Sequence, residues 1–187
     1  MRKFWYVFSL AVISGFVIYA FGLYPVALVN GTPIFARTWT RTLDAEKRVV
    51  NVRAYASHAE LVDFSSPKNA RLLDAIRKNT LTFLVDSVLM NAEGSRVVPD
   101  LEQLSMHRVN DELGRNQVTE QTASAVYGLD LATLKEMVLM PQARQEVLDQ
   151  TLAAEQKNFG DWLRGARGRA KVRFFFVPFT WDREGIK

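Results

Sequence analysis

Hydrophobic and polar positions divide the chain into an apolar beginning and a longer, patterned remainder. Residues Phe4–Leu23 form an uncharged, mostly apolar run that, as a helix rising about 1.5 Å per residue, spans roughly 30 Å. Arg2 and Lys3 precede it, and aromatic residues stand near both ends, as they do in the headgroup zones of a membrane. The pattern predicts a short N-terminus and a transmembrane signal anchor within residues 1–25.

A cleaved signal peptide is the alternative interpretation of this run. Such a peptide has a shorter apolar stretch followed by a small-residue cleavage site, and the sequence has neither. We therefore favour an uncleaved anchor, with the lipid bilayer as partner of residues 4–23. Positive charges before the run place the N-terminus inside. The expected location is the cytoplasmic (inner) membrane, crossed once, with the main domain in the periplasm or another extracytoplasmic space.

Helical periodicity dominates residues 26–187, which are enough for one domain with a real core. Gly94 is expected to end the second helix in the left-handed conformation, and Asp100 to cap the third. A final long helix is predicted from Pro141 to Leu163, because proline cannot continue the preceding helix without a kink. The other helices are predicted over about 38–61, from Pro67 to Gly94, from Asp100 onward, over 120–127, and after a cap at Asp130.

Two short segments rich in β-forming residues flank the helices. Residues 26–29 end at an Asn30-Gly31 turn, and residues 171–177 alternate inward Val172, Phe174 and Phe176 with outward charges. Each segment alone would be an exposed edge, so we expect them to pair. The predicted fold is therefore mainly α: an N-terminal transmembrane helix, then a helical domain with a small β-pairing between its start (26–29) and its end (171–177).

An ordered set of motifs resembles the N-terminal chaperone domain of the SurA, PpiD and PrsA family of extracytoplasmic folding factors. The resemblance covers nearly all of residues 26–175 and implies a SurA-like helical domain over 26–187 that binds unfolded or partly folded polypeptide. Its motifs are Val26-Ala27-Leu28-Val29-Asn30-Gly31-Thr32-Pro33-Ile34, Leu72-Leu73-Asp74-Ala75-Ile76, Val98-Pro99-Asp100-Leu101-Glu102 and Tyr127-Gly128-Leu129-Asp130-Leu131-Ala132-Thr133-Leu134-Lys135.

In most relatives a parvulin-type prolyl isomerase domain of about a hundred residues follows, a typical domain length, whereas this sequence stops at Lys187. We therefore expect a membrane-tethered chaperone without catalysis, whose partners are unfolded or nascent extracytoplasmic polypeptides. The alternative is an accessory or scaffold subunit that docks one fixed membrane-protein partner. A third interpretation, a stand-alone prolyl isomerase, conflicts with the missing domain.

Composition offers little support for other chemistry. The chain has no cysteine, and His58 and His107 are its only histidines, so no metal, cofactor or catalytic site is expected. A net charge of +4 raises the question of nucleic acid. The expected outside location argues against nucleic acid and makes lipid headgroups the better candidates for Arg164, Arg167 and Arg169. A simpler interpretation is that these arginines favour the C-terminal end of a helix dipole.

Two groups of residues are candidates for contact with polypeptide or another partner. Met90, Met106, Met137 and Met140 could line an adaptable groove, because unbranched thioethers fit varied partners, although helical spacing makes most of them ordinary core. Met137 and Met140 are the preferred candidates of this set. The apolar tail has more surface than a two-stranded pairing can cover, which makes candidates of Phe175, Val177, Phe179 and Trp181.

Overall fold

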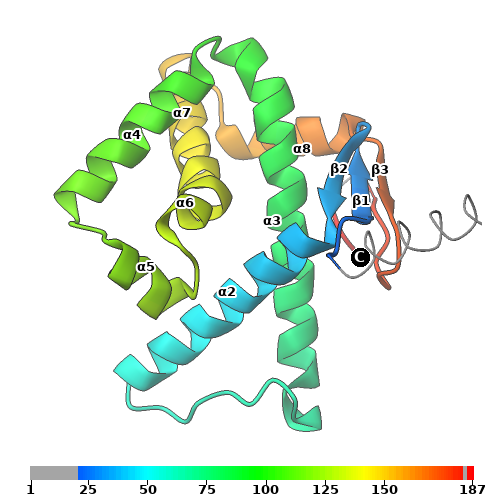
Figure 1. Cartoon of the computed structure of the whole chain (residues 1–187). Coiled ribbons are helices and arrows are strands. Elements are labelled where there is room, and N and C mark those ends of the chain that lie inside the picture. The colour runs from blue at the N-terminus through cyan, green and yellow to red at the C-terminus, as the bar shows by residue number, and fades with distance from the viewer. Residues whose placement is uncertain (1–20, 183–184) are drawn as a thin grey trace, which may run out of the picture.

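The structure is a computed structural model that describes residues 21–182 and 185–187. Helix α3 runs through the middle, with a small sheet on one side and α4 to α7 on the other (Figure 1). The elements are β1 (Pro25–Val29), β2 (Thr32–Phe35), α2 (Ala36–Ala56), the 3-10 turn η1 (Pro67–Asn69), α3 (Ala70–Val97), α4 (Leu101–Arg115), α5 (Glu120–Tyr127), α6 (Leu131–Leu134), the π-helical segment η2 (Lys135–Leu139), α7 (Met140–Ala154), α8 (Phe159–Arg169) and β3 (Val172–Phe174).

The sheet has the order β2-β1-β3, with both pairs antiparallel. Asn30 and Gly31, at φ 52° and 91°, form the two-residue turn between β1 and β2, as expected for an Asn-Gly hairpin. Ala27 faces Phe174 across the β1–β3 pair, so the predicted link between the two ends of the domain is present over 27–29 and 172–174. The predicted inward alternation fails at Phe176, which has φ 60° and is 86% exposed.

The main core lies between the sheet and α3. One face of α3 is apolar and fully buried at Leu81, Val85 and Leu89, and it packs against the inner face of β1 at Ala27 and Val29. Smaller buried clusters hold α3 to α7 and α8, α2 to α5 and α6, and α4 to α7. The C-terminal end lies beside the sheet (Figure 1), where Ile186 pairs with Trp181 and enters the main core.

Several predicted helix boundaries are correct and others are not. Helix α5 ends at Gly128, which has φ 70°, and the Asp130 side chain caps α6 by accepting the Thr133 N–H at 2.8 Å. Asp100 precedes α4 but makes no side-chain cap hydrogen bond. Gly94 does not end α3, which continues to Val97.

Gly94 has a packing role instead of a capping role. A Cβ atom at this position would lie 2.8 Å from a Leu101 methyl and 2.9 Å from a Leu148 methyl, both of which are buried. The glycine therefore lets α4 and α7 approach α3 closely.

The predicted helix from Pro141 to Leu163 is two helices. Residues 155–158 separate α7 from α8, with Gln156 at φ 59°, and the Asn158 side chain caps α8 by accepting the Asp161 N–H at 3.1 Å. Helix α2 likewise ends at Ala56, five residues before the predicted end at Leu61.

The transmembrane part of the predicted fold needs correction. No helix within residues 21–182 and 185–187 is long and apolar enough to cross a membrane. Most of the predicted span, residues 4–20, lies outside the described residues, and Phe21–Leu23 lead through a turn into β1. Even α3 carries charges along its length, Asp74, Arg77 and Asp86 among them. A single-pass inner-membrane protein with its main domain in the periplasm is therefore not supported, and the described fold is mainly helical with one small sheet.

Candidate functional site

An open groove of about 570 Å³ lies where β2, α3 and the α4–α7 region meet. Its volume is in the range of typical ligand sites. Its lining combines three methionines and other apolar side chains with three uncharged polar and four charged residues. They are Pro33, Ile34, Phe35, Leu84, Val88, Met106, Ala132, Met137, Met140, Pro141, Thr38, Ser87, Asn91, Glu102, Lys135, Glu136 and Arg144.

The three methionines come from three different elements and reach different depths. Met106 of α4 is 43% exposed, Met137 of η2 is half-buried and Met140 of α7 is buried. Thioether side chains are flexible and polarizable, so they adapt to irregular apolar partners. The three methionines therefore give the groove an adaptable apolar lining that includes exposed, half-buried and buried positions.

Pro141 determines the local backbone of this lining. Its nitrogen carries no hydrogen, so it cannot donate to the carbonyl of Met137 four residues earlier. The residues just before α7 form the π-helical segment η2, which lets the chain continue from α6 into α7 without the predicted break. Met137 and Met140 both face the groove from this continuous stretch.

Ion pairs join α4, which carries Met106, to α7, which carries Met140. Arg144 donates to Glu102 through Nη2 at 2.6 Å and Nε at 3.1 Å, and Arg108 Nη1 lies 2.8 Å from Glu146 Oε2. Both pairs are partly exposed, so each contributes little stability by itself. Both pairs join α4 to α7, and Glu102 and Arg144 also place paired charge in the lining of the groove.

The predicted contact residues fall into two separate places. Met137 and Met140 line the groove, as does Met106, whereas Met90 is buried in the cluster between α3 and α7. The tail residues lie away from the groove: Val177, Phe179 and Trp181 are half-buried against the main core, and the Phe175 N–H donates to the Val26 carbonyl at 2.9 Å. Most of the tail therefore covers the core.

One tail residue is left on the surface. Phe176 is 86% exposed at a positive φ, which is a sterically unfavourable backbone for a bulky side chain. The rings of Phe176 and Tyr24 stand nearly perpendicular, with their centroids 5.8 Å apart. A second hollow, lined by Trp39 and by residues 176–179, lies beside it.

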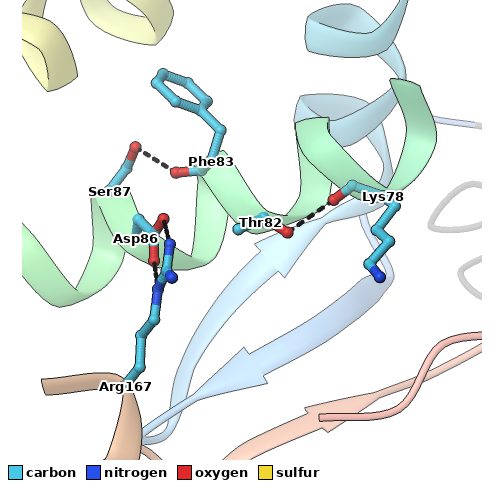
Figure 2. A network of polar contacts seen from close by, with 6 residues as sticks. All are labelled: Lys78, Thr82, Phe83, Asp86, Ser87 and Arg167. Atoms are coloured by element: carbon cyan, nitrogen blue, oxygen red, sulfur yellow. Dashed lines mark hydrogen bonds and ion pairs between the residues drawn. The ribbon is translucent and has the colours of Figure 1, made fainter. Parts of the chain in front are cut away.

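The predicted headgroup contacts each have an acidic partner within the protein. Arg167 donates to both carboxylate oxygens of Asp86, at 2.8 and 2.5 Å, and thereby joins α8 to α3 (Figure 2). Burial raises the pKa of Asp86, and the hydrogen bonds that Arg167 donates to Asp86 raise the pKa of Arg167. Arg164 pairs with Asp161 at 2.6 Å and Arg169 with Glu93 at 2.5 Å. These contacts fit the simpler interpretation, a basic helix end.

The hydroxyl groups of Thr82 and Ser87, near Asp86 in α3, donate hydrogen bonds to backbone carbonyls. Figure 2 shows Ser87 and Thr82 bonded to the carbonyls of Phe83 and Lys78, one turn earlier in α3. Neither hydroxyl is directed at Asp86 by these bonds, so the Asp86–Arg167 pair is a structural contact between two helices and not part of a catalytic set.

The two histidines lie apart from one another on the surface. His107 is exposed and its Nδ1 lies 2.9 Å from Asp111, and His58 lies in the exposed loop after α2. In the part of the chain that the structure describes, no three His, Asp or Glu side chains are grouped as metal ligands.

Comparison with known proteins identifies no relative: no family model, curated protein or solved structure matches this chain significantly.

Proposed function

We propose that this protein binds extended or partly folded polypeptide without catalysis, and that the groove between β2, α3 and α4–α7 receives apolar side chains of the bound chain. The observation that carries the proposal is the convergence of Met106, Met137 and Met140, from three elements, on one open apolar groove. Adaptable methionine surfaces are typical of proteins that bind many sequences. The motif resemblance to the SurA-type chaperone domain supports the same proposal.

The groove fits a side-chain-tolerant binder better than a small-molecule enzyme. It is open to solvent and mainly apolar, and two of its charged residues, Glu102 and Arg144, neutralise one another. Three uncharged polar residues, Thr38, Ser87 and Asn91, also line it, but the apolar residues are more numerous, so apolar contact predominates. Apolar contact without strict orientation is what the binding of varied polypeptides requires.

The alternative is a scaffold subunit that docks one fixed partner. Phe176 favours it, because an exposed aromatic ring held at an unfavourable φ is typical of a site where strain serves a contact. The two candidates differ in promiscuity and in the surface used, so one set of experiments separates them.

The full-length protein is tested first against several chemically different denatured clients in an aggregation assay. Protection of several clients at near-stoichiometric ratios is expected. Failure to protect any of them overturns the holding function and favours the scaffold. The slow phase of a proline-limited refolding reaction should stay unchanged, since isomerisation needs a site that stabilises the twisted bond. Acceleration of that phase would show catalysis.

A matched pair of variants on α4 then locates the binding surface. Met106→Glu places a carboxylate in the groove, whereas Leu104→Glu places one on the same helix at a similarly exposed position, 48% against 43%, away from the groove lining. Met106→Glu should weaken client binding by about 5- to 100-fold, by loss of apolar contact and by desolvation of the carboxylate. Equal weakening by both variants would show that the groove is not the site.

A further inference from the structure

The outer face of the sheet continues from the groove to a basic hollow. In the strand register Pro33 of β2 lies opposite Leu28 of β1, and Leu28 lies opposite Arg173 of β3, so these three residues form one row across the sheet. Leu28 is half-buried and lies outside the core, unlike its neighbours Ala27 and Val29. Pro33 also lines the groove, so the row begins at the groove and ends at a cation.

The far end of this row is a hollow of about 470 Å³ lined by Leu28, the Asn30-Gly31 turn and three basic residues. Arg169 is paired with Glu93, but Lys171 and Arg173 are exposed and have no ion-pair partner in the described parts of the chain. Lys171 directly precedes β3 and Arg173 lies within it, and both residues line the same hollow. The hollow therefore presents two unpaired positive charges above an apolar floor.

We infer that a polypeptide held in the groove crosses the edge of β2, runs over this sheet face, and places acidic side chains on Lys171 and Arg173. The inference rests on the proposed function and names the preferred class of client: an apolar segment adjoined by acidic residues. Charge complementarity selects this occupant, since the hollow is basic and the protein carries a net charge of +4.

The distances set the spacing within the client. Neighbouring strands lie about 4.8 Å apart, so the path from β2 to β3 is roughly 10 Å, which about three residues of extended chain cover. The client crosses the sheet instead of adding to it as a fourth strand at β2. Pro33 stands in that edge strand and has no N–H to donate, which disfavours strand addition there.

The test uses fluorescence anisotropy of labelled peptides with the full-length protein. The first peptide has a Leu-Met-Leu block, three neutral residues and two Glu, and its partner carries Gln in place of Glu. Both are made in the forward and the reversed order, because the chain direction is not fixed by the argument. In one order the Glu peptide should bind about 2- to 30-fold tighter than the Gln peptide at low salt, from two exposed charge contacts. High salt should remove the advantage.

Two double variants identify the cations. Lys171→Gln/Arg173→Gln should abolish the advantage of the Glu peptide and leave binding of the Gln peptide unchanged. Lys157→Gln/Arg164→Gln removes the same amount of charge from exposed residues outside the hollow and should preserve the advantage. Equal binding of Glu and Gln peptides in both orders, or an advantage that survives Lys171→Gln/Arg173→Gln, overturns the inference alone. Failure of the Gln peptide to bind at all overturns the proposed function of the groove, and the inference with it.

Discussion

Phe174 and Phe176 stand two residues apart at the end of the domain, and their environments predict opposite results for the same substitution. Phe174 lies opposite Ala27 in the β1–β3 pair and packs against the main core. Complete burial makes Phe→Ala cost about 3–5 kcal/mol, so a half-buried ring should cost about 2–3 kcal/mol in the free energy of unfolding. Phe176→Ala loses only the edge contact with Tyr24 and should cost less than about 1 kcal/mol.

The measurement is urea unfolding of the full-length protein followed by the helical circular dichroism signal. Phe174→Ala should lower the midpoint without changing the slope, since the surface exposed on unfolding is nearly the same. The corresponding fall in Tm is about 4–12 °C for a domain of this size. Phe and Ala are similarly disfavoured at a positive φ, so the backbone strain at residue 176 contributes little to the stability difference between Phe176→Ala and the wild type. Equal losses in the two variants would refute the assignment of Phe174 to the core and of Phe176 to the surface.

Two further predictions concern carboxylates. Asp86→Asn removes the charge that Arg167 binds and should lower the free energy of unfolding by about 2–4 kcal/mol, because the side chains of Asp86 and Arg167 are only 13% and 24% exposed. The double variant Asp86→Asn/Arg167→Met should recover part of that loss in the same unfolding assay. A loss well under 1 kcal/mol for Asp86→Asn would mean that water screens the pair. At Asp130, hydrogen bonds from Thr133 lower the pKa below 3.8, so its contribution to stability is present above that pH and disappears as the pH falls through the folded pKa. Asp130→Asn should therefore lose less Tm than the wild type between pH 7 and pH 3, and an identical loss would contradict the cap.

Local signals predicted the parts of the fold that local chemistry determines. Asn30-Gly31 favours a tight hairpin, Gly128 ends α5 at a positive φ and Asp130 caps α6, and all three follow from the residue and its nearest neighbours. Pairing of the two ends was predictable because both segments are rich in β-forming residues and neither has another strand to cover it.

The errors arose where distant packing decides the conformation. Gly94 is typical of a helix end, but contact with Leu101 and Leu148 explains the glycine inside a helix that continues. Phe176 fits an alternating strand pattern, yet β3 ends at Phe174 and the backbone turns to a positive φ. The outcomes at Gly94 and Phe176 are not visible in a window of neighbouring residues. The membrane span predicted over residues 4–23 is a separate case: no helix within residues 21–182 and 185–187 could cross a membrane, and residues 4–20 lie outside the described residues.

The groove combines both kinds of information. Helical spacing favours core positions for Met106, Met137 and Met140, and only the packing of α4 against α7 brings all three to one groove. Pro141 indicates a disturbed helix correctly, but the disturbance is a π-helical segment and not a break. Such segments are frequent at functional sites, because they change the direction of side chains without ending the helix. Pro141 disfavours a helix at the point where the chain nevertheless continues helically, and the same residues line the groove. Local rules are often violated at functional sites, so this coincidence is what a binding role for the groove predicts.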